Sequence, residues 1–158
     1  MKTLLFILII FQNKLINADM NYICDNIFLG DANSAKNETY LKENNVSAVV
    51  NCANGILSNY NEIKFLELDL YDSSSEPLFP KLHVAYMFIK EYPENNILVH
   101  CLQGKSRSVS VVIFYLMKEK GWDYDTCIKF IQERRPVANP NSGYVSQLKD
   151  YFDKYIKK

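Results

Sequence analysis

The chain has 158 residues, of which 48% are hydrophobic and 23% are charged, which is ordinary for a globular protein. This length predicts one domain with a single sizeable core. The 18 lysines and arginines balance 18 aspartates and glutamates, so no bulk electrostatic field attracts nucleic acid. The four cysteines form no Cys-x-x-Cys pair and only two histidines are present, which argues against a zinc site.

The segment 1–19 differs from the rest of the chain. Its unbroken apolar run, residues 4–11, follows a basic start and precedes a polar stretch and the small Ala18, in an order close to that of a signal peptide. The run is too short to span a membrane, which takes about 20 residues. Ile16 is a poor fit to the small-residue pair before a cleavage site. An extra helix packed on the domain and a true start at Met20 stay open as alternatives.

The rest of the chain alternates between patterns typical of strands and of helices. Short apolar runs predict the strands, while helical spacing of apolar residues, bounded by Gly or Pro stop signals, predicts the helices. In chain order, we expect strands at 27–29, 48–51, 63–68 and 97–100, and helices at 32–43, 77–91, 107–120, 123–134 and 143–155. This order predicts an α/β fold in which a mostly parallel central sheet is flanked by helices on both faces.

The most informative stretch connects the last predicted strand to the helix at 107–120. Cys101 follows the strand directly, and Arg107 stands where the helix begins, after five intervening residues. N–H groups at a helix N-terminus bind phosphate and stabilise a thiolate, so we expect Cys101 to ionise below the ordinary thiol pKa of about 8.5. Gly104 lets the backbone turn closely around an anion, and Arg107 offers a planar fork for two phosphate oxygens.

The string HCLQGKSRS resembles the signature of cysteine-dependent protein tyrosine phosphatases, which is His-Cys, five residues, Arg, and Ser or Thr. Its Ser-Arg-Ser ending is similar to the dual-specificity branch. Residues 27–35, 65–72 and 130–148 resemble the opening strand and helix, the general-acid segment and the closing segment of that family. The resemblance implies a phosphotyrosine-phosphatase-like fold, with residues 20–158 as the catalytic domain of an atypical, single-domain dual-specificity phosphatase. A buried structural cysteine beside a surface arginine is the alternative.

The resemblance implies a role for each residue of this loop. Cys101 attacks phosphorus and forms a phosphocysteine that water hydrolyses, while Arg107 and the loop amides stabilise the transferring phosphoryl group. We expect Ser108 to donate a hydrogen bond to the Cys101 sulfur, although a helix-start hydroxyl would occupy the same place. His100 is expected to orient the loop and lower the thiol pKa rather than act as a base. The phosphate-binding residues implied are Leu102, Gln103, Gly104, Lys105, Ser106 and Arg107.

Asp72 maps onto the family's general acid, which protonates the leaving oxygen and then takes a proton from water. On position alone, Asp72 is hard to separate from Glu67 and Asp69 in the same segment. The family match favours Asp72, and a loop-capping aspartate is the alternative. Asn141 matches the family's Asn after Pro and implies a tie between a neighbouring loop and the phosphate loop.

Cys52 follows the strand predicted at 48–51, which we expect beside the strand that leads into Cys101. Both sulfurs would then lie at one edge of the sheet. Some family members with a cysteine at this strand position close a reversible disulfide to the catalytic cysteine, so the resemblance implies a redox pair of Cys52 and Cys101. The alternative is that Cys52 is a small buried apolar residue.

The implied function is a protein phosphatase that hydrolyses phosphotyrosine and phosphoserine or phosphothreonine, with phosphoproteins as partners and without a metal or an organic cofactor. We expect a monomer that does not bind nucleic acid, and membrane association stays open. A free thiolate suits the reducing cytoplasm; the secretory route is the alternative if residues 1–18 are a signal peptide. A phosphoinositide or RNA-end phosphatase would use the same loop chemistry. A catalytically dead phospho-binding module also stays open, although such modules commonly lose one of Cys101, Arg107 and Asp72.

Overall fold

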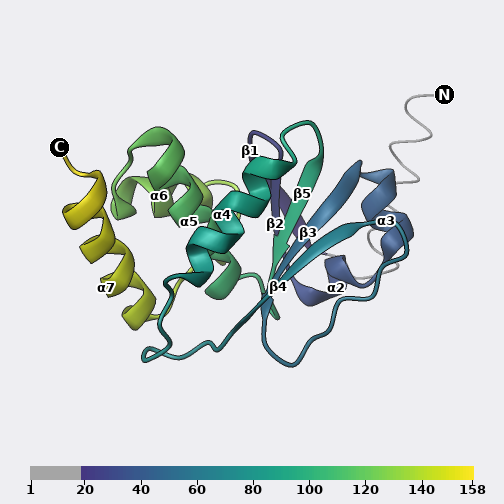
Figure 1. Cartoon of the computed structure of the whole chain (residues 1–158), viewed down its shortest axis with the longest axis horizontal. Coiled ribbons are helices and arrows are strands. Elements are labelled where there is room, and N and C mark those ends of the chain that lie inside the picture. Colours follow the sequence, from purple (N-terminus) through teal and green to yellow (C-terminus); the bar gives the residue numbers. More distant parts are fainter. Residues whose placement is uncertain (1–18) are drawn as a thin grey trace.

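Figure 1 shows the computed structural model, which describes residues 19–158. In those residues, five strands form one sheet in the order β1-β2-β5-β3-β4. The strands are β1 (Met20–Cys24), β2 (Ile27–Gly30), β3 (Val46–Ala53), β4 (Lys64–Leu70) and β5 (Asn96–His100). β1 pairs antiparallel with β2, and the other neighbouring strands pair in parallel, which confirms the predicted fold class. The predictions for residues 1–18 lie outside the described residues.

Helices cover both faces of this sheet, as the sequence predicted (Figure 1). They are α2 (Ala32–Ala35), α3 (Glu38–Glu43), α4 (Lys81–Glu91), α5 (Arg107–Lys120), α6 (Tyr124–Gln132) and α7 (Ser142–Tyr151), and α7 continues into a π-helical turn, η1 (Phe152–Ile156). Successive residues of a strand point to opposite faces. Val49 and Leu98 therefore join a small core under α2 and α3, while Val50 and Val99 join the main core under α4 and α5. α6 and α7 pack against α5.

The helix α5 forms where the sequence predicts it, with the expected bounds, and its residues from Arg107 to Met117 are buried. Gly121 ends it in the left-handed conformation, with a φ of 68° that glycine adopts without steric cost. Its backbone N–H donates to the Met117 carbonyl. The strand and the helix on either side of the Cys101 loop are thus both in place.

The helix expected at 32–43 is divided into two in the structure. Asn37 has an extended backbone, and its side chain accepts a hydrogen bond from the Tyr40 backbone N–H at 3.0 Å. Such a contact is typical of a residue that caps the start of a helix. The extended backbone of Asn37 therefore interrupts the helix, and its side chain caps the start of α3.

One helix begins later than expected, and one strand was not expected. The helix expected at 77–91 begins only at Lys81, directly after Pro80, because proline is tolerated at the start of a helix but not within it. The strand β1 was not expected at all. Its signal in the sequence is the turn-forming Asp25 between two short apolar segments, and in the structure Asp25 has a φ of 50°. No helix within residues 19–158 has the length and apolarity to cross a bilayer.

Candidate functional site

Residues 101–107, here called the signature loop, lie at the carboxyl end of β5, between β5 and α5 (Figure 1). β5 is central in the sheet, with β2 and β3 as parallel neighbours. Cys101 directly follows β5, and Arg107 is the first residue of α5. Sites of α/β sheets form at this end of the strands.

The Cys101 side chain is buried and contacts two hydrogen-bonding groups; the residue is 3% exposed. The Ser108 hydroxyl lies 3.2 Å from Sγ, and the Gly104 backbone N–H donates to Sγ at 3.2 Å. Burial raises the pKa of this thiol. The two hydrogen bonds and the positive charge of Arg107 outweigh burial, so the pKa of Cys101 lies below its ordinary value. The site therefore favours a thiolate.

Gly104 is at a position where no other residue fits. Its φ is +65°, in the left-handed region, and an added Cβ would stand 2.5 Å from Arg135 Nη2 and 2.6 Å from the Gly30 carbonyl oxygen. Both the backbone conformation and the lack of space require glycine. The expectation that Gly104 permits a close turn of the loop is consistent with this geometry.

Between Cys101 and Arg107, the signature loop contributes backbone to the site, since the Gly104 N–H contacts the Cys101 sulfur. The side chains of Leu102, Gln103 and Lys105 are exposed. The Leu102 carbonyl accepts a hydrogen bond from the Ala32 N–H at 3.1 Å, and the Lys105 carbonyl accepts one from the Asn139 N–H at 2.8 Å. Residues of α2 and of the segment before α7 thus hold the carbonyl groups on the outside of the loop.

Arg135 is a site residue that the sequence analysis missed. Its Nε donates to the Gly104 carbonyl at 2.8 Å, and its Nη2 donates to the Gln103 carbonyl at 3.1 Å. The same guanidinium contacts the Asp19 carboxylate at 3.0 Å and the Asn21 side chain at 2.8 Å. In the sequence, Arg135 lies in an Arg-Arg-Pro string, and nothing local shows which arginine is buried.

Arg107 is largely buried, at 8% exposed. Its Nη1 donates to Asn54 Oδ1 at 3.1 Å and to the Leu70 carbonyl at 3.2 Å. Its Nε is buried and has no hydrogen-bond partner in the part of the chain that the structure describes. A buried guanidinium with an unused donor is suited to bind an anion.

Asn141 links Asp72 to the signature loop. Its Nδ2 donates to Asp72 Oδ1 at 3.0 Å, and its backbone N–H donates to the Ser106 hydroxyl at 3.0 Å. Its Oδ1 accepts from the Tyr144 N–H at 2.9 Å and so caps α7. Asn141 therefore connects the Asp72 loop with the signature loop.

The other two candidate acids of this segment have different neighbours. Glu67 accepts a hydrogen bond from the Ser58 backbone N–H at 2.6 Å. Asp69 has a φ of 49°, and its carbonyl accepts a hydrogen bond from Lys81 Nζ at 2.7 Å. Of the three acids, Asp72 is the one whose carboxylate is tied to the signature loop through Asn141.

His100 is buried, and its Nδ1 lies 3.3 Å from the Cys101 carbonyl, to which it donates. Burial lowers the pKa of His100 to about 4, so the ring is neutral at neutral pH. This contact is suited to orienting the loop, and that role for His100 stays a prediction. A neutral ring has no charge with which to lower the pKa of the thiol.

Cys52 is fully buried in β3, and both it and Cys101 are free thiols. Burial and the nearby negative charge of the Cys101 thiolate raise the pKa of Cys52 well above its ordinary value. Cys52 is therefore a protonated thiol close enough to Cys101 to interact with it electrostatically. Its pairing with Cys101 stays a prediction.

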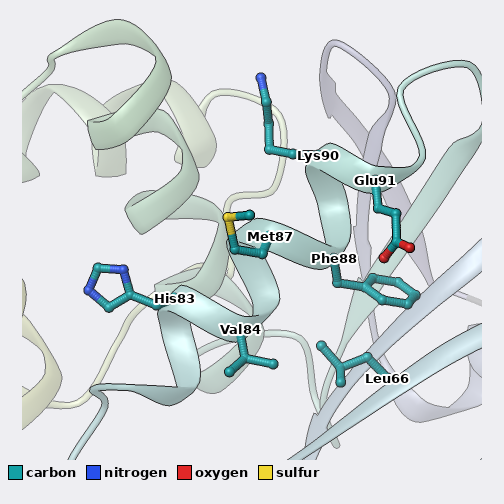
Figure 2. Close-up of a pocket in the computed structure, with 7 residues that line it drawn as sticks. All are labelled: Leu66, His83, Val84, Met87, Phe88, Lys90 and Glu91. Carbon is teal, nitrogen blue, oxygen red and sulfur yellow. The ribbon is translucent and has the colours of Figure 1, made fainter.

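Several hollows lie outside the signature loop. Figure 2 shows an apolar one of about 670 Å³ beside α4 and β4. Its lining residues are Leu66, His83, Val84, Met87, Phe88, Lys90 and Glu91, none of which was predicted to belong to the site. A smaller hollow of about 190 Å³ is lined by His100 together with Asn51 and Tyr60, among others. Within residues 19–158, no group of three or more His, Cys, Asp or Glu side chains could hold a metal ion.

Comparison with known proteins agrees with this geometry. Residues 27–154 match a family model described as dual specificity phosphatase, catalytic domain. Dual specificity protein phosphatase 1B of Arabidopsis thaliana is 32% identical over 142 residues, which are 88% of this chain and 84% of that protein. Several other curated relatives are much longer, and this chain spans 17% to 21% of their length.

Two solved structures show the same fold. The crystal structure of DUSP15 aligns with a TM-score of 0.82 and 25% identity, covering 87% of this chain and 90% of that chain. The human tyrosine phosphatase-like serine/threonine/tyrosine-interacting protein aligns with a TM-score of 0.80 and 30% identity, covering 87% of this chain and 98% of that one.

The hydrogen bond from Ser108 generates a prediction about the ionisation of Cys101. Ser108→Ala removes a donor that stabilises the thiolate, so the pKa of Cys101 rises and its alkylation by iodoacetamide requires a higher pH. Because a hydrogen bond to a charged group contributes about 1.5–3 kcal/mol, we expect the midpoint to rise by about one to two pH units. Mass spectrometry of the Cys101 peptide measures the alkylation. Ser110→Ala, at a buried serine that bonds the Ser106 carbonyl instead, is the control. An unchanged midpoint in Ser108→Ala would contradict the assignment.

Proposed function

This chain belongs to the dual specificity phosphatase family, and from that premise we propose that it hydrolyses phosphotyrosine and phosphoserine or phosphothreonine in proteins through a phosphocysteine intermediate. The observation that carries the proposal is the buried Cys101 sulfur, which the Ser108 hydroxyl and the Gly104 N–H contact at 3.2 Å each; these contacts lower the pKa of the thiol. Burial raises the pKa of both cysteines, but Cys127 has no such neighbours to oppose it, and its pKa rises to about 12. Cys101 is therefore set apart as a nucleophile and not as a structural cysteine.

In the first proposed step, the Cys101 sulfur attacks phosphorus. An S–P bond forms while the bond from phosphorus to the substrate oxygen breaks, and the leaving oxygen takes a proton from the Asp72 carboxyl. Negative charge on the transferring phosphoryl group is stabilised by the N–H groups of the signature loop and by Arg107. The bridge through Asn141 supports this role for Asp72, because it holds the acid beside the loop.

In the second proposed step, water attacks the phosphocysteine. The Asp72 carboxylate takes a proton from the water, the S–P bond breaks, and inorganic phosphate and the Cys101 thiolate are released. The Ser108 hydroxyl, 3.2 Å from Sγ, supports this step because a hydrogen bond to the departing sulfur stabilises its negative charge. The cycle ends with the nucleophile and the acid in their starting states.

The unused donor on Arg107 supports an anionic substrate. A buried N–H without a partner costs about 1–3 kcal/mol, and a phosphate oxygen would supply the missing acceptor for Nε. The guanidinium is planar, so two of its N–H groups can bind two oxygens of one phosphoryl group. An ammonium in its place would bind as a point charge.

The first functional prediction concerns the nucleophile and its arginine. Cys101→Ser should abolish turnover of phosphopeptides while the protein still binds phosphate esters, because the loop N–H groups and Arg107 remain. Arg107→Lys should also lose turnover, since it cannot make the paired contact. Phosphate release and calorimetric binding measure the two effects. Turnover by Cys101→Ser within tenfold of the unmodified protein would exclude the mechanism.

The same assay separates the substrate classes. Phosphotyrosine and phosphothreonine peptides, a phosphoinositide panel and 5′-phosphorylated RNA are compared at equal concentration. We expect turnover of both peptides. Turnover confined to the lipids or to RNA would assign the loop chemistry to those substrates. Binding of phosphopeptides without turnover would assign the chain to the phospho-binding alternative.

The second prediction concerns the acid. Asp72→Asn should lower kcat by about 10²–10⁴ with alkyl phosphates, whose leaving oxygen requires a proton. Aryl phosphates with acidic phenols should lose much less, because their leaving groups depart without protonation. Asp69→Asn is the matched control on the same segment and should have a mild effect. A larger loss in Asp69→Asn than in Asp72→Asn would move the acid to Asp69.

The third prediction concerns oxidation. Peroxide is reduced to water as it oxidises the Cys101 thiolate to a sulfenic acid, and condensation with the Cys52 thiol then releases water and forms a disulfide. Recovery by a thiol reductant should be full in the unmodified protein and impaired in Cys52→Ser, where Cys101 goes on to the sulfinic acid. Cys127→Ser, at another buried cysteine, should recover fully. Equal recovery in all three proteins, or the absence of a Cys52–Cys101 peptide in mass spectrometry, would reject the pair.

A further inference from the structure

We propose that Arg135 is a positioning residue of the reaction: it holds the backbone of the signature loop in the orientation that directs its N–H groups at the nucleophile and the phosphate, and Asp19 holds Arg135 in place. This inference rests on the proposed function for its catalytic consequence. Its effect on the Cys101 thiol can be measured without turnover.

The guanidinium of Arg135 uses all of its donors. A guanidinium side chain has five N–H groups. In the structure, Nε bonds the Gly104 carbonyl, Nη1 bonds Asp19 Oδ1 and Asn21 Oδ1, and Nη2 bonds Asp19 Oδ2 and the Gln103 carbonyl. The side chain is 1% exposed. Such a complete set of partners fixes the position of the group and leaves it no donor for a substrate.

The two carbonyls that Arg135 holds determine where two N–H groups point. In a planar trans peptide, the C=O and the following N–H point in opposite directions. The Gln103 carbonyl shares its peptide with the Gly104 N–H, which donates to Cys101 Sγ at 3.2 Å. The Gly104 carbonyl likewise shares its peptide with the Lys105 N–H. By binding both carbonyls on the outside of the loop, Arg135 turns both N–H groups inward.

Asp19 offsets the energetic cost of burying the Arg135 guanidinium. A buried guanidinium without a counter-ion would be strongly destabilising. The Asp19 carboxylate meets Nη1 and Nη2 of Arg135 at 3.0 Å each, in the paired geometry that is the strongest for these groups. The paired charges largely cancel, so Arg135 acts on the loop through directed hydrogen bonds and not through its net charge. These contacts place Asp19 inside the catalytic unit, one residue before the boundary expected at 20–158.

The fit between Arg135 and the loop has little spare room. A Cβ at Gly104 would stand 2.5 Å from Arg135 Nη2. A lysine at 135 has one nitrogen and cannot reach two carbonyls and a carboxylate in a single plane. Arg135→Lys should therefore keep a positive charge near Asp19 but release at least one of the two loop carbonyls.

The test compares two neighbouring arginines in the full chain. Arg135→Lys should lower kcat/KM for an aryl phosphate about 10- to 100-fold, as expected for a misplaced reacting group, with most of the loss in kcat. It should also raise the alkylation midpoint of Cys101 by about one pH unit, because the Gly104 N–H is no longer aimed at sulfur. Arg134→Lys is the control, because that side chain bonds the Phe130 carbonyl of α6 and stacks on the Phe130 ring. In this variant kcat/KM and the alkylation midpoint should both be unchanged.

Asp19→Asn provides a milder variant if Arg135→Lys does not fold, since it keeps an acceptor but removes the charge. It should shift both readings in the same direction as Arg135→Lys, and Asp19→Glu should restore them. A folded Arg135→Lys or Asp19→Asn protein with an unchanged alkylation midpoint and unchanged kcat/KM would overturn the proposal. If the unmodified protein hydrolyses none of the phosphate esters, the proposed function fails, while a shift of the alkylation midpoint in these variants would still establish the positioning role.

Discussion

The site depends on hydrogen bonds made on the outside of the signature loop. N–H groups can face an anion on one side of a loop only when the carbonyls on the other side have partners, because an unpaired buried carbonyl is costly. Here Ala32 at the start of α2, Asn139 before α7 and the Arg135 guanidinium supply those partners. Elements from the two ends of the described chain therefore meet behind one loop, and the Cys101 sulfur lies on its other side.

The fold brings these elements together through the position of β5. A central strand with parallel neighbours places the loop at its carboxyl end between helices from both faces of the sheet. α5 begins directly at the loop and is buried along most of its length, so the loop is anchored at both ends by core packing. Asp72, the proposed acid, follows β4 at the sheet edge and is linked to the loop through Asn141 at the start of α7. Buried elements hold Cys101, whereas Asp72 lies on an exposed loop.

The sequence pattern predicted those parts of the site that lie close together along the chain. The apolar run before Cys101, the glycine at 104 and the helix at 107–120 all lie in one short stretch, and their periodicity and spacing were sufficient. Asp72 needed the family resemblance, because its neighbours Glu67 and Asp69 have equivalent patterns. Arg135 could not be found, since its partner Asp19 is 116 positions away and Arg134 beside it has the same chemistry. The apolar spacing at 32–43 continues across Asn37, so it did not predict the break there. The extended backbone of Asn37 interrupts the helix, and its side chain caps α3.

Because Asp19 pairs with Arg135, a difference of one residue in where the polypeptide starts would change the surroundings of the signature loop. A chain translated from Met20 would lack Asp19, and two of the five donors on the Arg135 guanidinium would lose their acceptor together with the counter-charge. A chain cleaved after Ala18 would keep that carboxylate and would carry its new α-ammonium on the same residue. The two starts differ by a single amino acid, yet one leaves the ion pair behind the nucleophile complete and the other leaves a buried cation alone.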